Sequence, residues 1–347
     1  MPEKGGDLLG NEDLRSKLVG MSEAGRLHHC LLFEGPDGVG KSATALWLAQ
    51  TVNCTGPSMF GPRTEPCGGC WSCRAITDGQ HPDVIVVGID PKRTAPIISV
   101  RQSREIISKM ALRPYNAKRR FVIIDPAQAM GNQSANALLK TFEEPPKDTG
   151  FILVCPSARR LLPTVRSRSQ RIRFRPVESQ RLAAWLQARQ IEDARWIARM
   201  ADGCPGRALA LASGEAEEWR QQRDELIAII GGSLEEVFKY TDKLTRGDRG
   251  LWTKRAERVL DALARLVRDA LVLAGGGREH SLYNSDRVPL VRAWSQALGV
   301  AGSERVGQSI DKARQELAAY VNGRLLFDAL LSAVMAELGS ARKATAP

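Results

Sequence analysis

The chain has 347 residues, enough for two or three domains, and its 43% hydrophobic and 26% charged residues are typical of an ordinary globular protein. Lysine and arginine total 50 against 39 aspartates and glutamates, so the formal net charge of +11 favours a polyanionic partner such as nucleic acid. No apolar run reaches the length of a membrane span, and the polar start predicts no signal peptide. We therefore exclude an integral membrane protein and expect a cytoplasmic one.

The first half of the chain alternates apolar strand patterns with helical patterns. After a helix at 11–24, strands are predicted at 30–33, 83–87, 120–125, 151–155 and, more exposed, 171–174. Helical patterns lie between them at 43–49, 100–112 and 134–144. Near-continuous apolar strands that alternate with helices predict an α/β fold, with a parallel sheet covered on both faces. Ligands of such sheets bind beyond the carboxyl ends of the strands.

Strand patterns stop at Pro176, and the rest of the chain is helical in pattern. Short helices are expected at 178–190, 192–201 and 206–213, and longer ones follow, including 306–320 and 325–338. The sequence therefore predicts three domains. These are an α/β domain at 1–176, a three-helix lid at 177–214 and an all-α domain at 215–347.

Residues 35–42 read GPDGVGKS and match the G-x-x-x-x-G-K-[ST] phosphate loop. A strand precedes the loop and a helix follows it, so Gly35, Gly38 and Gly40 would let backbone N–H groups wrap a phosphate at a helix N-terminus. Lys41 would reach the β- and γ-phosphates, and the Ser42 hydroxyl would hold Mg²⁺. The alternative is a glycine-rich turn that matches by chance, which the flanking strand and helix disfavour.

Asp125, at the end of the third strand, takes the place of the carboxylate that holds Mg²⁺. The next residue is Pro126, where a hydrolase usually carries a second carboxylate that orients the attacking water. Unless Gln128 substitutes for that carboxylate, the sequence predicts a site that binds ATP and Mg²⁺ weakly, or binds them without hydrolysis.

Four cysteines lie in a loop rich in glycine and proline after the phosphate-loop helix: Cys54, Cys67, Cys70 and Cys73. Their spacing, in a chain expected to occupy a reducing compartment, predicts a tetrahedral zinc site with a structural role. An iron–sulfur cluster, whose usual fourth cysteine is missing from the run, and unliganded thiols are the alternatives. His81 is a spare candidate ligand, although a His-Pro pair at a strand entrance is more often structural.

Further stretches carry a family resemblance: LLGN at 8–11, NALLKTFEEPP at 136–146, LLPTVRSR at 161–168 and NGRL at 322–325. With the phosphate loop and the cysteines, they resemble the delta-prime subunits of the bacterial DNA polymerase III clamp loader, in the AAA+ superfamily. The matching stretches span nearly the whole chain, and NALLKTFEEPP is highly specific to clamp loaders. The resemblance implies a RecA-like AAA+ domain with a zinc-binding insertion, a helical lid and a helical collar. The collar would join gamma/tau and delta subunits in a hetero-pentameric ring.

The resemblance also implies roles for single residues. The family's Ser-Arg-Cys motif falls on residues 167–169, which makes Arg168 the expected arginine finger, acting on ATP bound by a neighbouring subunit. Ser157 takes the place of the polar sensor of the γ-phosphate. In the lid, Gly206 stands where a sensor arginine is expected, and Arg207 follows it. Without the resemblance, Arg168 would read as part of a solvated basic face.

Three functions remain as alternatives. The first is a clamp-loader subunit that supplies Arg168 in trans, hydrolyses little or no ATP itself, and helps to load the sliding clamp onto primed DNA. Such a subunit belongs to a DNA polymerase complex without being catalytic alone. The second is an active ATPase motor of the gamma/tau kind, disfavoured by Pro126 and by the end of the chain at residue 347 without a long extension. The third is a small-molecule kinase, for which the helical C-terminal third offers no acceptor site.

Overall fold

The computed structural model of the chain describes residues 8–57, 64–89, 97–111, 113–319 and 322–344. Contacts between Cα atoms divide the chain into two compact units, residues 1–209 and 210–347. The domain boundaries expected at 176 and 214 remain predictions.

The first unit is built on a five-stranded parallel sheet with the strand order β2-β3-β4-β1-β5. Its strands are β1 (Cys30–Glu34), β2 (Val84–Val87), β3 (Arg120–Ile124), β4 (Thr149–Cys155) and β5 (Gln170–Arg173). Every residue of β3 and β4 is buried, as their apolar runs predict, whereas β5 alternates half-buried and exposed residues. Because these strands are parallel, the carboxyl ends of β1, β3 and β4 lie at the same end of the sheet, where the phosphate loop follows β1.

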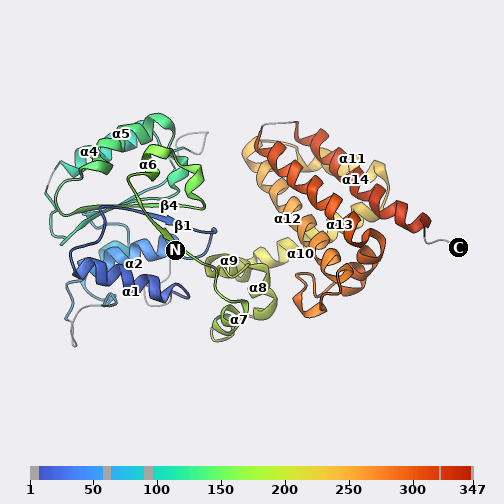
Figure 1. The fold of residues 1–347 in the computed structure, drawn as a ribbon, viewed down its shortest axis with the longest axis horizontal. Helices are drawn as coiled ribbons and strands as arrows, with labels where there is room; N and C mark the ends of the chain where they lie inside the picture. Colours follow the sequence, from blue (N-terminus) through green and yellow to red (C-terminus); the bar gives the residue numbers. More distant parts are fainter. Residues whose placement is uncertain (1–7, 58–63, 90–96, 112, 320–321, 345–347) are drawn as a thin grey trace. The chain divides into compact units, whose positions relative to one another are not determined.

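Helices cover both faces of this sheet (Figure 1). One apolar core lies between the sheet and the helices α4 (Val100–Met110) and α5 (Asn132–Glu143). A second core lies between the sheet and the helices α1 (Glu12–Glu23) and α2 (Lys41–Asn53). The α/β class with a parallel sheet covered on both faces is confirmed.

Shorter helices complete the first unit: α3 (Trp71–Thr77), α6 (Pro163–Arg166), α7 (Ser179–Gln187), α8 (Ala194–Met200) and α9 (Pro205–Ala210). The last of these ends earlier than the helix expected at 206–213. A π-helical turn at Leu211–Glu215 follows it, and Gly214 in that turn has a φ of 124°. A left-handed φ of this kind favours glycine and ends the regular α-helix.

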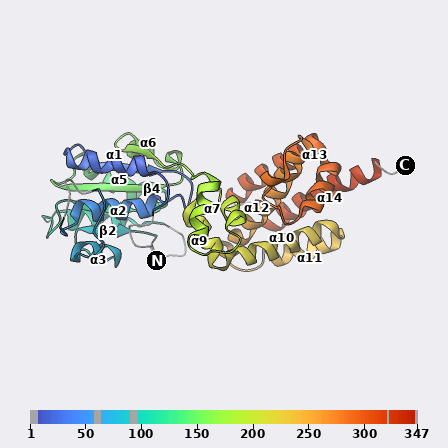
Figure 2. The same cartoon turned by 90° about the horizontal axis from the view of Figure 1, so that it is seen from below.

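The second unit contains the helices α10 (Ala216–Gly231), α11 (Leu234–Leu244), α12 (Arg249–Ala274), α13 (Val288–Ala318) and α14 (Gly323–Ala344). Helix α13 packs against both α12 and α14 (Figure 2). The helix expected from residue 306 begins at Val288 instead and bends at Gly299, whose φ is 58°. Buried Val291, Trp294 and Leu298 hold this earlier part of α13. None of the helices in the described ranges is long and apolar enough to cross a membrane.

Candidate functional site

The phosphate loop curls around its own lysine. Lys41 is only 5% exposed, and its Nζ donates hydrogen bonds to the carbonyl oxygens of Gly35 at 2.6 Å and Pro36 at 2.7 Å. Asp37 also lies 3.5 Å from the ammonium. Gly40, whose φ is 102°, supplies the left-handed turn that starts α2 directly after the loop. The ammonium is thus held inside the loop, where it can exchange carbonyl oxygens for those of a phosphate.

Ser42 and Asp125, the pair predicted to hold Mg²⁺, lie together. The Ser42 hydroxyl donates a hydrogen bond to Asp125 Oδ2, although 83 residues separate the two in sequence. Pro126 and Gln128 line the same cavity. The side-chain oxygen of Gln128 is buried and has no hydrogen-bond partner among the described residues. The site therefore has a serine and a carboxylate for a metal ion, and a proline where the second carboxylate is expected.

Ser42 and Asp125 line a cavity of about 410 Å³, a volume in the range of small-molecule sites. Apolar Leu8, Trp185 and Leu209 line the same cavity. Arg15, a buried lining residue, donates hydrogen bonds to the carbonyl oxygens of Leu8 and Gly10 and lies over the ring of Trp47. We did not predict Arg15 or Trp185, because each lies in a helix whose pattern marks only an amphipathic face.

The first turn of α9 contacts the phosphate loop through its backbone. The Gly206 N–H donates a hydrogen bond to the Gly38 carbonyl oxygen at 2.8 Å. A Cβ on Gly206 would lie 3.1 Å from that oxygen, and a Cβ on Gly38 would lie 2.7 Å from the backbone nitrogen of Arg207. Arg207 pairs with Asp202 at 3.2 Å. The position expected to carry the lid arginine therefore holds a glycine, and a side chain there would crowd the phosphate loop.

Ser157 lies beside the cavity rather than in it. Its neighbour Pro156 is a lining residue, while the Ser157 side chain accepts a hydrogen bond from the Arg159 N–H at 3.4 Å. The next residue is anchored by an acid that we did not predict. Glu34, at the end of β1, accepts a hydrogen bond from the Ala158 N–H at 2.8 Å and pairs with Arg171 at 2.7 Å. Burial opposes ionisation of Glu34, but these partners hold its pKa below the ordinary value.

Arg168 lies outside the cavity, in the turn after α6. Its side chain is 33% exposed and forms an ion pair with Glu143 at the end of α5. One terminal nitrogen also donates hydrogen bonds to the Thr164 carbonyl oxygen at 3.0 Å and to Ser167 Oγ at 3.3 Å. The guanidinium is therefore held at the surface, and Arg168 is not among the residues that line the cavity of its own chain.

The four predicted cysteines converge, and their Sγ atoms all lie within 4.8 Å of one another. Cys54 Sγ and Cys70 Sγ are 3.9 Å apart, close to the ~3.8 Å between ligands of a tetrahedral zinc ion with bonds of about 2.3 Å. Burial opposes ionisation, but hydrogen bonds from Cys73 and Thr55 lower the pKa of Cys70 to about 5. The cluster could hold a structural metal ion, and four protein ligands leave no position for a substrate. His81 is not part of it.

The cysteine cluster is fastened to α2, the helix that starts at the phosphate loop. Gln50 donates hydrogen bonds to the Cys73 carbonyl oxygen at 3.0 Å and to Thr77 Oγ1 at 2.8 Å. The Trp47 indole donates one to Glu65 at 2.5 Å. These contacts join the cysteine loop to the phosphate-loop side of the sheet.

Comparison with known proteins identifies the family. A family model described as "DNA polymerase III, delta subunit" matches residues 10–178. Over 321 residues the chain is 30% identical to the DNA polymerase III delta' subunit of Escherichia coli, and the match covers 91% of each protein. The chain belongs to the delta/delta-prime family of DNA polymerase III clamp-loader subunits.

Other relatives of this clamp-loader subunit include both delta' and gamma/tau proteins. It is 30% identical to the delta' subunit of Pseudomonas aeruginosa over 77% of its own length and 69% of the relative's. It is 29% identical to the gamma/tau subunit of Mycobacterium tuberculosis over its whole length, but spans only 59% of that protein. Because these identities are nearly equal, the choice between the two kinds of subunit depends on the chemistry of the site.

Proposed function

We propose that this clamp-loader subunit is of the delta-prime kind. In this proposal it assembles with gamma/tau and delta subunits in a hetero-pentameric ring and supplies Arg168 to the ATP site of a neighbour. It helps the ring to load the sliding clamp onto primed DNA during replication. The observation that carries the proposal is the pairing of Ser42 with Asp125 beside Pro126, a site equipped for a nucleotide and its metal but lacking the usual water-orienting carboxylate.

Two further observations support the assignment. Gly206 contacts Gly38 where a lid arginine would otherwise contribute to catalysis. Arg168 lies at the surface, outside the cavity of its own chain, as a residue that serves a neighbour must. The subunit would thus contribute a planar cation to phosphoryl transfer on another chain, where it stabilises charge that develops on the γ-phosphate.

The resident ion of the cysteine cluster is zinc in this proposal. Four thiolates at the observed separation suit its tetrahedral preference. The ion would join a loop rich in glycine and proline to α2 and thereby support the phosphate loop. Metal analysis of gently purified protein should give about one zinc per chain, and a brown, iron-containing protein would refute the assignment.

The second candidate is an active gamma/tau-like ATPase. The buried Lys41 and the intact loop favour it, because both elements of phosphate binding are retained. The two functions are separated by mixing the purified chain with the other clamp-loader subunits and measuring ATP hydrolysis before and after mixing. We expect co-purification, negligible turnover by the chain alone and stimulated turnover in the complex. Robust DNA-independent hydrolysis by the isolated chain would contradict the delta-prime assignment.

A further inference from the structure

The large exposed apolar side chains of the first unit all come from one stretch of the chain, residues 71–115, which contains the outer strand β2. In the described part of residues 1–209 these are Trp71, Val86, Ile89, Ile107 and Tyr115. They come from α3, β2, the residues just after β2, α4 and the loop before β3. We call this surface the β2 edge, since β2 is the outer strand of the sheet and, among the described residues, pairs with β3 alone. Single exposed apolar residues are common on proteins, but several of them in adjoining segments make this surface a candidate for binding.

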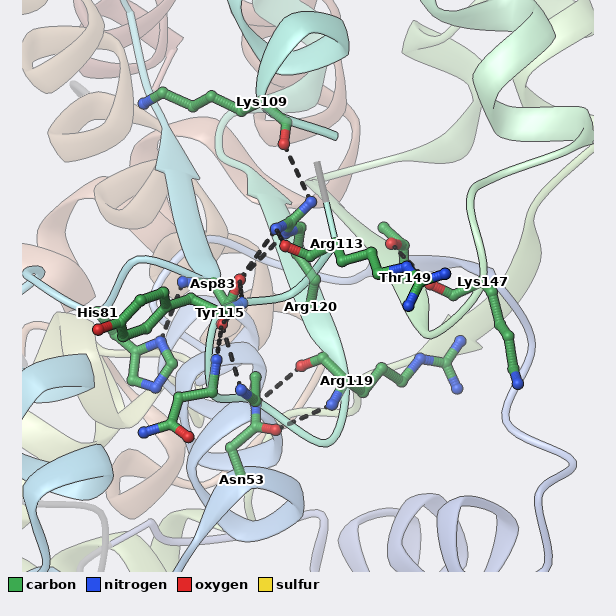
Figure 3. Close-up of polar contacts among 12 residues, drawn as sticks. Asn53, His81, Asp83, Lys109, Arg113, Tyr115, Arg119, Arg120, Lys147 and Thr149 are labelled. Carbon is green, nitrogen blue, oxygen red and sulfur yellow. Dashed lines mark hydrogen bonds and ion pairs between the residues drawn. The ribbon is translucent and has the colours of Figure 1, made fainter. Parts of the chain in front are cut away.

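A buried carboxylate holds the loop that carries Tyr115 (Figure 3). Asp83, 1% exposed, accepts hydrogen bonds from the backbone N–H groups of three successive loop residues: Tyr115 at 2.8 Å, Asn116 at 2.9 Å and Ala117 at 3.2 Å. Burial opposes ionisation of Asp83, but these donors, with Arg120, hold its pKa below the ordinary value. The loop backbone is therefore fixed by a charged acceptor in the interior.

Arg120 completes this support from the other side. Its guanidinium pairs with Asp83 at 3.0 Å and donates hydrogen bonds to the carbonyl oxygens of Lys109 and Arg113, each at 3.0 Å (Figure 3). The start of the loop and the end of α4 are thereby tied to the same buried ion pair. The Tyr115 side chain, in contrast, is 81% exposed. A rigid loop thus presents an aromatic ring to solvent.

The same support reaches a second exposed ring. The backbone N–H of Asp83 donates a hydrogen bond to His81 Nδ1 at 3.1 Å, and the His81 ring lies 5.2 Å from the ring of Trp71. Burial lowers the pKa of His81, so this imidazole is neutral at pH 7. Trp71 directly follows Cys70 of the cysteine cluster and is 51% exposed. The exposed side chains of Trp71 and Tyr115 are therefore both supported by the buried Asp83.

The segments that carry these rings have more exposed cations than exposed acids. Arg74 lies one turn after Trp71 on α3, and so on the same helical face. Lys109, Arg113 and Lys118 are exposed on α4 and the Tyr115 loop. Over the described residues of 71–89 and 100–118, the exposed acids are Asp78 and Glu105, and Glu105 pairs with Arg101 at 3.8 Å. Aromatic rings set among cations form the usual surface for single-stranded nucleic acid, because every base has a face that can stack.

We propose that the β2 edge binds single-stranded DNA. Unpaired bases stack on Trp71 and Tyr115, and the adjoining phosphates pair with Arg74, Arg113 and Lys118. The binding is independent of sequence, because stacking reads the face of a base and not its hydrogen-bonding edge. The aliphatic side chains would also suit a protein partner, but the charge balance favours a polyanion. This surface does not depend on the role of Arg168.

The test measures the fluorescence anisotropy of a labelled oligo-dT strand titrated with the full-length chain. Tyr115→Ser and Trp71→Ser should each weaken binding about tenfold, whereas Tyr115→Phe, which keeps the ring, should bind as the wild type does. Leu251→Ser is the matched control, because Leu251 is 65% exposed and lies in the second unit. If Trp71→Ser disturbs the fold because it lies beside Cys70, Tyr115→Ser still tests the proposal.

An abasic strand of the same length separates stacking from charge. The wild type should prefer oligo-dT, and Tyr115→Ser should reduce that preference. Arg113→Ala should lower the slope of log affinity against log salt by about 0.7, the value for one phosphate of a single strand. Equal binding of oligo-dT and abasic strands by the wild type would overturn the proposal. Wild-type affinity in a folded Tyr115→Ser variant would also overturn it and leave the β2 edge as a surface for a protein.

Discussion

The phosphate loop and the turn that carries Arg168 each present one cation, and they present it in opposite ways. Lys41 is 5% exposed and is bound by carbonyl oxygens of its own loop. Arg168 is 33% exposed and is held on the surface by Glu143 and Thr164, outside the cavity. An inward lysine suits a phosphate bound by the same chain, and an outward arginine suits a phosphate bound by another. This comparison leads us to assign binding and catalysis to separate parts of the chain.

The largest effect is expected from removal of the outward cation. Arg168→Ala in the reconstituted clamp loader should slow hydrolysis at the neighbouring site about a thousandfold, because an arginine finger contributes roughly that factor to turnover. The steady-state ATPase rate of the complex would lose nearly all of the contribution made by that site. Gel filtration should still show the assembled complex. Arg160→Ala, eight residues earlier and also exposed, is the control and should keep the wild-type rate. An unchanged ATPase rate in Arg168→Ala would contradict the assignment of Arg168 as an arginine finger.

Removal of the proposed zinc ion should affect the phosphate-loop side and spare the Arg168 turn. The cysteine loop is fastened to α2 through Gln50 and Trp47 and has no such bond to the Arg168 turn in the described residues. A chelator should therefore raise hydrogen exchange in α2 and α3 but not at 163–169. A loss of about 2 kcal/mol would lower the thermal midpoint by roughly 5 °C. Cys70→Ser protein should show no further shift on chelation, and a shift of equal size there would mean that the chelator acts elsewhere.

A smaller effect is expected at Glu143, the acid that holds the proposed arginine finger. Glu143 engages two nitrogens of Arg168, so a neighbour's phosphate must compete with this carboxylate for the guanidinium. Glu143→Gln keeps a hydrogen-bond acceptor and removes the charge. Because exposed ion pairs contribute at most about 1 kcal/mol, the stimulated ATPase rate should rise by up to about fivefold. Glu144→Gln, at the next exposed residue, should leave the rate unchanged. A slower Glu143→Gln complex would show that the acid supports the finger.

The sheet and the phosphate loop could be predicted because local sequence determines them. The apolar runs of β3 and β4 and the glycines before Lys41 each specify their structure within a few residues. The start of α13 could not be predicted, because Gly299 interrupts the pattern and burial of Val291 and Trp294 maintains the helix through tertiary packing.

The cysteine cluster was also predictable, since its spacing defines a ligand set. The hydrogen bonds that hold these sites in place could not be predicted, because they join residues far apart in sequence. Glu34 with Ala158 and Asp83 with the Tyr115 loop are examples. In each case the only local signal is an acid at one boundary of an apolar strand: Glu34 is the last residue of β1, and Asp83 directly precedes β2. The sequence alone does not distinguish such an acid from a surface charge, because its partners are close to it only in the folded chain.

The smallest effect is expected at the inward cation. If the chain binds a nucleotide without hydrolysing it, Lys41→Ala should change the ATPase rate of the complex less than twofold. Loss of the ammonium should reveal itself instead in weaker binding of a fluorescent ATP analogue to the isolated chain, with Lys17→Ala, an exposed lysine of α1, as the control. A large fall in turnover would mean that this phosphate loop is itself a working ATPase site.

The most direct test sets the two cations against each other in one preparation. ATP hydrolysis is measured for clamp loaders assembled with wild-type, Arg168→Ala or Lys41→Ala subunits at equal occupancy. The account predicts a strong loss for Arg168→Ala and nearly full activity for Lys41→Ala. The opposite ranking, with activity lost in Lys41→Ala and kept in Arg168→Ala, would contradict it.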